Sequence, residues 1–299
     1  MNFILLCSRW NYGLDIAPIQ VINSFVTFET TVLDSGKNVK MSFEAKSLSF
    51  LLHILQTTMP FIPIAIFSIL IFNPCTPPFL LSMSPNCHAI RWTTGVRPEI
   101  LIVLFEIWMS IHITFSGTLW IHHMLLVAIG CILNYSEILA RKAKDAINQT
   151  EHEYCVHIYR CIQLLEKCLN DFLMVKIVPA LITFVPGIQI LGQYICVKMH
   201  HDVRMPGFLI FPLLTIDAAL INIIIFTLAS RVNSVSIKVL ATHEKYSSKF
   251  KRTSAIKKSI RACAVLKIKF GSNYIDNGTP LVIQNFCADQ TMSLILIGS

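Results

Sequence analysis

One long apolar stretch limits what this chain can fold into. It covers Pro206–Ser230 (PGFLIFPLLTIDAALINIIIFTLAS), and Asp217 is its one ionisable residue. At about 1.5 Å per residue, a helix of this length crosses a hydrocarbon core of roughly 30 Å. Eleven Lys and Arg residues follow between Arg231 and Lys269. Because cytoplasmic loops are rich in Lys and Arg, we expect this basic segment to lie in the cytosol, which fixes the direction of the helix before it.

The composition indicates a membrane protein along the whole chain. Hydrophobic residues make up 54% of it and charged residues 14%, whereas soluble domains have about a quarter charged residues. We therefore expect an all-α, polytopic helical bundle in the lipid bilayer. The net charge of +8 is explained by basic loops between apolar spans, so no nucleic-acid partner is expected.

Four further segments are apolar enough to be expected as membrane spans. We expect the chain to have two parts. Residues 1–46 are a cytoplasmic lead-in or the remnant of a truncated helix, and residues 47–299 form a single transmembrane domain. Apolar patches in the lead-in are too short to span a bilayer. The five expected spans are Ser47–Phe72, Ile100–Met124, Phe172–Val197, Pro206–Ser230 and Thr279–Ile297.

Two arrangements remain open for the apolar run Pro98–Leu133. As one helix it would be about 54 Å long, more than a bilayer needs, so the part after Met124 would project into the cytosol. A re-entrant hairpin is the alternative, because Gly117 and Gly130 could break the run. The next segment, Asn134–Asp171, is polar with one apolar stripe at helical spacing, and it is expected to form an amphipathic helix that leads into the third span.

The distribution of cations predicts the topology. With the basic segment in the cytosol, the cytosolic loops hold twenty Lys and Arg residues and the outer loops hold four. This asymmetry predicts a cytoplasmic N-terminus and an extracellular C-terminus. A receptor of the rhodopsin type is disfavoured, because its C-terminus is cytoplasmic.

Two short motifs stand near the end of the chain. Phe270–Asp276 has the sequence FGSNYID, and Thr291–Ile297 has the sequence TMSLILI. These two motifs, together with the order of the expected spans, make residues 100–299 resemble the arthropod gustatory and odorant receptor superfamily. The last helix of that family has a Phe/Tyr-rich start, often with Ile-Asp, and then Thr-Tyr followed by apolar residues. Thr291 matches the Thr, Met292 stands in place of the Tyr, and the family has seven spans where five are expected here.

The resemblance implies a chemosensory receptor in the plasma membrane: a ligand-gated, non-selective cation channel, assembled as a homo- or heterotetramer, that detects small organic ligands. Its last helix would line the pore. On that helix, polar residues form two adjacent stripes, and four copies around an axis would make a hydrated, mildly acidic ring suited to cations. The alternative is a weak interfacial helix. The pore-lining candidates are Gln284, Asn285, Asp289, Thr291 and Met292.

Other chemistry depends on single groups. Asp217 lies in the middle of an expected span, where it could contact a bound ligand or a neighbouring helix. If it were instead a carboxylate that couples ion and substrate movement, the chain would be a secondary transporter.

Cys75 and Cys87 share an expected outer loop, where a disulfide between them is an alternative to two free thiols. A further alternative for the whole chain is a non-functional relative of the receptors.

Enzymatic chemistry is not indicated. The sequence has no nucleophile elbow, phosphate-binding Gly loop or paired-carboxylate motif, so we expect no catalytic residues and no cofactor. His152, Cys155, His157 and Cys161 contain metal-binding atoms. Their spacing matches no standard zinc finger, and we expect no metal there.

Three Asn-x-Ser/Thr sequons, at Asn134, Asn148 and Asn277, test the topology. All three lie on the side expected to face the cytosol, where N-glycans are not added, so the full chain expressed in cells should show no mobility shift after endoglycosidase treatment. A sequon introduced into the expected outer loop of residues 73–98 is the positive control. A glycan on Asn277 would contradict the topology.

Overall fold

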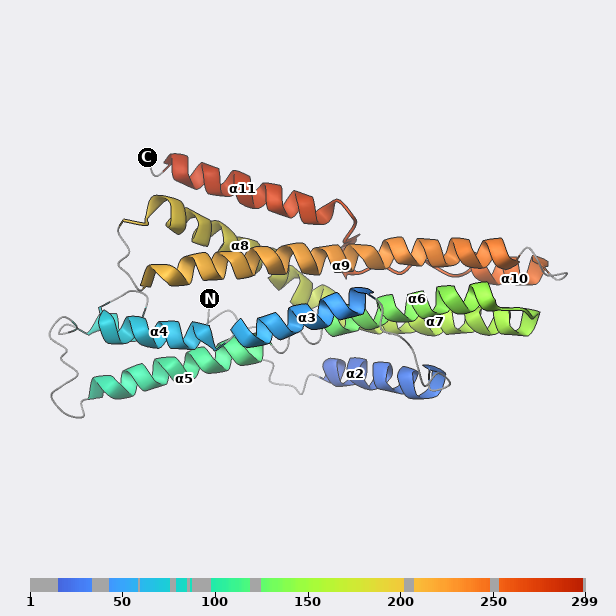
Figure 1. The fold of residues 1–299 in the computed structure, drawn as a ribbon, viewed down its shortest axis with the longest axis horizontal. Helices are drawn as coiled ribbons and strands as arrows, with labels where there is room; N and C mark the ends of the chain where they lie inside the picture. Colours follow the sequence, from blue (N-terminus) through green and yellow to red (C-terminus); the bar gives the residue numbers. More distant parts are fainter. Residues whose placement is uncertain are drawn as a thin grey trace.

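The structure is a computed structural model, and it describes residues 16–33, 43–58, 60–75, 79–84, 87, 98–118, 125–201, 207–247 and 253–297. Most of these residues are helical, as expected for an all-α bundle. Figure 1 shows an elongated molecule whose helices run roughly along its long axis. The helices are α2 (Ile16–Phe28), α3 (Phe43–Thr58), α4 (Phe61–Phe72), α5 (Pro98–Thr118), α6 (Ala128–Asp145), α7 (Gln149–Phe172), α8 (Val178–Lys198), α9 (Ile210–Ser247), α10 (Thr253–Arg261) and α11 (Thr279–Ile297).

Three helical segments are long and apolar enough to cross a membrane. They are Leu48–Phe72, which comprises most of α3 and all of α4, Val178–Lys198 and Ile210–Tyr246. They correspond to three of the five expected spans. The other two, in α5 and α11, are not among them; in α11 the apolar run is interrupted by four polar residues, Gln284, Asn285, Asp289 and Gln290.

The apolar run of residues 98–133 forms two helices in place of one. α5 ends at Thr118, directly after Gly117, and α6 begins at Ala128. In Figure 1, α5 and α6 lie towards opposite ends of the molecule. Residues 119–124, the last part of the expected span 100–124, lie outside the described residues.

The amphipathic segment of residues 134–171 also reverses direction. A single helix was expected, and that expectation is wrong: α6 ends at Asp145, and α7 begins at Gln149 and packs back against α6. A capping box makes the break, because Glu151 Oε2 accepts a hydrogen bond from the backbone N–H of Asn148 at 3.4 Å while the Asn148 side chain caps the helix N-terminus.

α9 connects the two halves of the molecule. It has 38 residues, so it is about 57 Å long, and it packs against α8 and α11 in one half and α6 and α10 in the other. Side chains from α6, α7 and α9 form the largest core; among them, Ile132, Ile162 and Ala229 are fully buried. α9 therefore starts beside α8 and α11, in what we call the apolar half of the molecule, and ends beside α6 and α10, in what we call the basic half.

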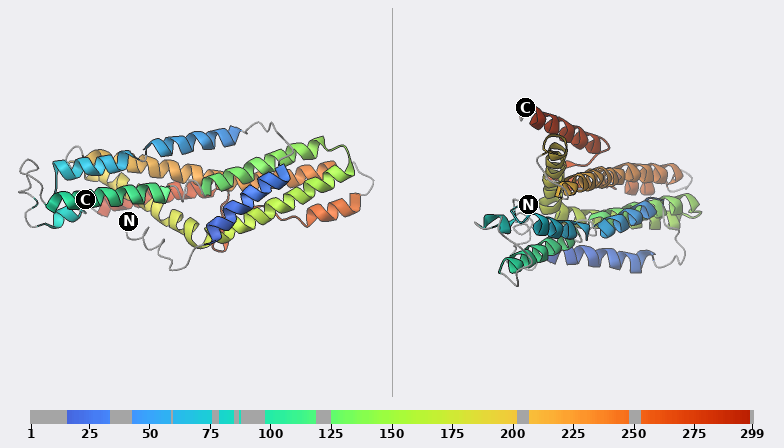
Figure 2. Two further views of the ribbon diagram at one scale, coloured as in Figure 1. Left: turned by 90° about the horizontal axis from the view of Figure 1, so that it is seen from below. Right: turned by 60° about the vertical axis from the view of Figure 1, so that its left-hand side comes forward.

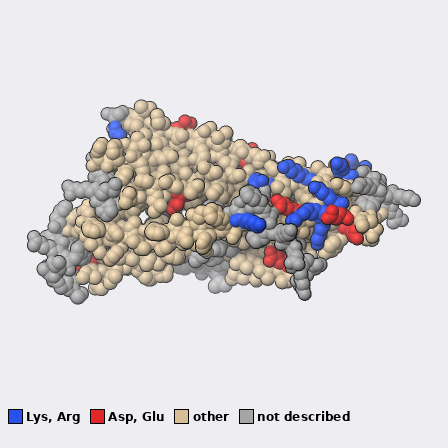
Figure 3. Space-filling view, viewed as in Figure 1, with Lys and Arg blue, Asp and Glu red and all other residues tan. Residues whose placement is uncertain are grey.

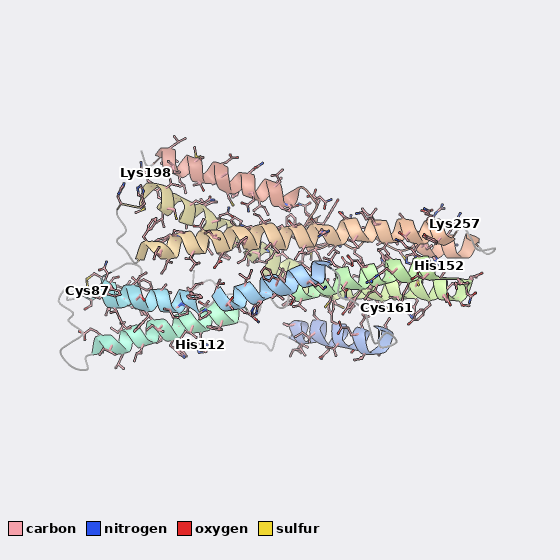
Figure 4. The ribbon with its side chains drawn as sticks, in the orientation of Figure 1. Cys87, His112, His152, Cys161, Lys198 and Lys257 are labelled. Atoms are coloured by element: carbon pink, nitrogen blue, oxygen red, sulfur yellow. A yellow bond between two sulfur atoms is a disulfide. The ribbon has the colours of Figure 1, made fainter. Side chains whose placement is uncertain are left out.

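Charge is segregated along the long axis. Figure 3 shows Lys and Arg gathered at the right-hand end, where α6, α7, α9 and α10 lie, and a largely uncharged surface over the rest of this face. Lys257 and His152 lie at the basic end, and Lys198 and Cys87 lie at the opposite end (Figure 4). The C-terminal end of α11 is on the Lys198 side (Figure 1). This is the charge distribution expected of a bundle with one end outside the hydrocarbon region.

Part of the N-terminal lead-in packs at the basic end. α2 contacts α7, the ring of Phe28 lies 4.9 Å from that of Tyr135, and the Tyr135 hydroxyl donates to Glu29 Oε1 at 2.6 Å. Residues 16–33 are thus held against the α6–α7 pair.

Gly192 allows α8 and α9 to approach closely. A Cβ there would collide with Thr215 Oγ1 and lie 3.3 Å from Thr215 Cβ. The Thr215 hydroxyl is held in place because it donates to the carbonyl oxygen of Phe211 at 2.7 Å. Small residues at such crossings are what bring membrane helices together.

We therefore expect Gly192→Ala to lower the free energy of unfolding by about 1–3 kcal/mol, as overpacking does. The measurement is thermal unfolding of the full chain in detergent. Gly187→Ala on the same helix is the matched control, because a Cβ there meets nothing within 4 Å. Equal effects of the two substitutions would contradict the close crossing.

Candidate functional site

Three side-chain amides join three helices in the apolar half of the molecule. Asn222 Nδ2 on α9 donates to Gln189 Oε1 on α8 at 2.8 Å. Gln189 Nε2 then donates to Gln284 Oε1 on α11 at 2.9 Å. Gln189 and Asn222 are 2% and 1% exposed. We refer to these three residues as the amide cluster; it bonds α11 to the rest of the bundle at a buried point.

A second bond fixes α11 further along its length. Thr291 Oγ1 lies 2.9 Å from Gln193 Oε1 on α8 and 2.8 Å from the carbonyl oxygen of Cys287, so its proton is shared between them. Gln284 and Thr291 are seven residues apart, about two helical turns, and therefore lie on one face. Cys287, between them, is fully buried. This face of α11 is packed against α8 and α9 of the same chain.

The other face of α11 is exposed. Asn285, Asp289 and Met292 are exposed side chains, and Met292 has 58% of its surface accessible. In the right-hand view of Figure 2, α11 lies at the edge of the molecule beside α8. The five pore-lining candidates thus divide into two sets: Gln284 and Thr291 bind α8, and the other three face outwards.

Asp217 is not part of the amide cluster. It lies on α9, is half-buried, and makes no hydrogen bond with a described residue. It precedes Asn222 by five residues, so the two side chains leave α9 in different directions. The structure therefore gives Asp217 no hydrogen-bonded helix contact within the described part of the chain.

The segment that leads into α11, residues 263–278, is bound to α7 and α9 at the basic end. The Tyr159 hydroxyl lies 2.8 Å from Ser236 Oγ and donates to the carbonyl oxygen of Ala264 at 3.0 Å. Ser236 Oγ in turn accepts from the backbone N–H of Leu266 at 2.8 Å. Burial raises the pKa of Tyr159 to about 12, so the phenol remains a donor at physiological pH.

Asn170 continues this anchoring by pairing with backbone groups. Its Nδ2 donates to the carbonyl oxygen of Lys267 at 2.8 Å, and its Oδ1 accepts from the N–H of Lys269 at 2.9 Å. Glu166 Oε1 accepts from Asn170 Nδ2 and from the N–H of Lys267. Burial raises the pKa of Glu166, against the lowering effect of the Lys267 N–H and of Lys269. The side chains of α7 thereby fix the path of the chain before α11.

The motif of residues 270–276 forms a hairpin and a helix cap. Lys269–Phe270 pairs antiparallel with Asn273–Tyr274, and Gly271 has a φ of 53°, a backbone conformation that favours glycine. Asp276 Oδ1 then accepts from the backbone N–H of Thr279 at 2.9 Å and from its hydroxyl at 2.7 Å. These hydrogen bonds from Thr279 lower the pKa of Asp276. The motif sets where α11 begins.

Cysteine and histidine side chains make two further contacts. Cys75 and Cys87 form a disulfide, with their Cα atoms 5.3 Å apart. The rings of His152 and His243 lie 5.1 Å apart, edge to face, between α7 and α9. Within the described residues, no group of three or more His, Cys, Asp or Glu side chains could hold a metal ion.

Compared with protein-family models and with curated proteins, the chain matches none.

Most of the amide cluster was not predicted from the sequence. Gln189 and Asn222 were not singled out, although each is a polar residue inside an apolar run. Such residues at bilayer depth are a signal in themselves, because they need a partner. Which partner each one has depends on helix packing, which the sequence does not display.

Gln189 is the central member of the amide cluster, so its replacement removes a hydrogen-bond partner from both Asn222 and Gln284. Gln189→Leu leaves Asn222 and Gln284 without this partner, and we expect the free energy of unfolding in detergent to fall by about 1–2 kcal/mol. In a double-mutant cycle, adding Asn222→Leu should cost less than it does alone. Asn285→Leu, on the exposed face, is the control and should have little effect. Strict additivity would mean that the two amides do not interact.

Proposed function

We propose that this chain is a subunit of a chemosensory, ligand-gated cation channel of the plasma membrane. It crosses the membrane five times, with a cytoplasmic N-terminus and an extracellular C-terminus. One observation carries the proposal: the side of α11 that its own chain leaves exposed has two polar residues, Asn285 and Asp289, among exposed apolar residues such as Val282 and Leu296. Polar groups at bilayer depth are costly unless they face protein or water. A water-filled pore between subunits would hydrate the side chains of Asn285 and Asp289.

Assembly around an axis gives this face its role. Gln284 and Thr291 are bonded to α8, so they position the helix, and Asn285, Asp289 and Met292 line the conduit. Four copies of Asp289 form a ring of carboxylates that attracts cations and repels anions. The subunits are identical or include a co-subunit of the same architecture.

Ligand binding acts on this pore through α8 and α9. A small organic ligand binds among α5, α8 and α9 and has higher affinity for the open arrangement than for the closed one, so it shifts the population towards the open state. The amide cluster supports this coupling, because Gln189 bonds to both α9 and α11. A shift of α8 relative to α9 therefore changes the position of α11.

The charge distribution supports the orientation. Within the described part of the chain, Lys and Arg gather at the end of the molecule where α6, α7 and α10 lie (Figure 3). The C-terminal end of α11 lies at the other end (Figure 1). With the basic end in the cytosol, the C-terminus is extracellular.

Asp217 favours a second candidate, a secondary transporter. It is half-buried in the longest apolar helix and makes no hydrogen bond with a described residue, and carboxylates in such places couple ion and substrate movement in transporters. In that case Asp217→Asn abolishes substrate-coupled flux, and changes at Asp289 matter little.

Whole-cell recording tests the channel. In cells that express the full chain, alone or with a co-subunit, a panel of small organic compounds should evoke a cation current. Asp289→Asn should reduce this current severalfold and Asp289→Lys should abolish it, because the charge of the ring is removed or reversed. Asp171→Asn, the same substitution at an exposed position of α7, is the control and should leave the current unchanged. Normal surface expression with no current, or a current indifferent to Asp289→Lys, would contradict the proposal.

A further inference from the structure

A groove of about 540 Å³ lies between α9 and the first turns of α11. α9 contributes Ile223, Thr227 and Arg231 to its lining. From the other side come Asn277, just ahead of α11, and two residues of α11, Leu281 and Gln284. Side chains that bind anions, accept or donate hydrogen bonds, and contact hydrocarbon thus share one open surface.

These side chains are ordered by depth in the membrane. Arg231 directly follows the apolar stretch that ends at Ser230, so it lies at the boundary with the cytosol. Thr227 is one helical turn deeper, about 6 Å, and Ile223 is two turns deeper, about 12 Å. Headgroups occupy about the first 6 Å of a bilayer leaflet, and hydrocarbon begins below them. The α9 side of the groove therefore changes from cationic to polar to apolar over the depth at which a lipid does the same.

The α11 side of the groove alternates in polarity: Asn277 at its start is polar, Leu281 is apolar and Gln284 is polar. Ser234 Oγ donates to Asn277 Oδ1 at 3.1 Å, which places Asn277 near the level of Arg231 and leaves its Nδ2 as a donor. Leu281 and Gln284 lie deeper along α11, and Leu281 is 66% exposed. The apolar part of the groove is open to the side of the molecule.

We propose that this groove binds one anionic phospholipid of the cytoplasmic leaflet. The phosphate accepts hydrogen bonds from Arg231, whose planar guanidinium has five N–H donors and suits phosphate oxygens, and from Asn277 Nδ2. Thr227, one helical turn below Arg231, lies at the level of the ester carbonyls and donates to them. The acyl chains run along Ile223 and Leu281.

Electrostatics favours a lipid over a second copy of this chain as the occupant. The groove opens at the start of the segment with eleven Lys and Arg residues, which attracts the anionic inner leaflet. The site depends on the membrane insertion and the orientation of α9 and not on the channel function, although it lies against the helix proposed to line the pore.

Native mass spectrometry of the full chain in a neutral detergent tests the site, with dioleoyl phosphatidylserine and dioleoyl phosphatidylcholine as probes. The wild-type chain should retain one phosphatidylserine per chain and bind phosphatidylcholine more weakly. Arg231→Gln should weaken phosphatidylserine binding about tenfold, the loss expected for charge-assisted hydrogen bonds. Thr227→Trp fills the groove without changing charge, and it should remove the bound lipid as well.

Arg141→Gln is the matched control, because Arg141 is an exposed cation of α6 at the same end of the molecule and does not line the groove. It should bind lipid as the wild type does, and all variants should keep the wild-type helical circular dichroism. Equal losses with Arg231→Gln and Arg141→Gln would show general surface attraction and overturn the site. Unchanged binding by Thr227→Trp, or chain dimers that exclude lipid, would overturn it too.

Discussion

Side-chain amides inside a bilayer need partners, and this requirement organises the apolar half of the molecule. An unpaired amide in hydrocarbon costs several kcal/mol by the more severe transfer scales. Gln189, Asn222 and Gln284 bond to one another across α8, α9 and α11, and only the buried Oδ1 of Asn222 is left without a hydrogen bond to a described residue among the polar atoms of this cluster. Apolar contacts alone give membrane helices little reason to choose one neighbour, because lipid tails are as apolar as leucine. The amide bonds supply that choice. They also make the two faces of α11 unequal: one is bonded within the chain and the other keeps polar residues exposed.

The basic half is held by a different kind of interaction. There, side chains of α7 bind backbone groups of the segment before α11: Asn170 pairs with Lys267 and Lys269, and Tyr159 reaches Ala264. These bonds lie outside the apolar half and fix where α11 starts, while the amide cluster fixes which face it presents. Because α9 runs through both halves, a displacement at one end has a continuous helix through which to reach the other.

The sequence predicted the parts of the fold that depend on local pattern. The apolar run over residues 279–297 has the bounds of α11, and three apolar stretches are helices long enough to span. The reversal between α6 and α7 was missed, although Asn148 and Glu151 have the spacing of a capping box. The hairpin at Gly271 and the partners of Gln189 could not be predicted from the sequence, for physical reasons. Two-residue strands have no periodicity to detect, and the choice among distant amides is made by helix packing, where Gly192 allows α8 and α9 to meet.

Orientation is the claim on which the pore, the ligand route and the lipid site all depend. The most direct test is antibody access to epitopes fused at the two ends of the full chain in intact and in permeabilised cells. The account predicts that the C-terminal epitope is labelled in intact cells and that the N-terminal epitope is labelled only after permeabilisation. Labelling of the N-terminal epitope in intact cells, with the C-terminal epitope protected, would contradict it.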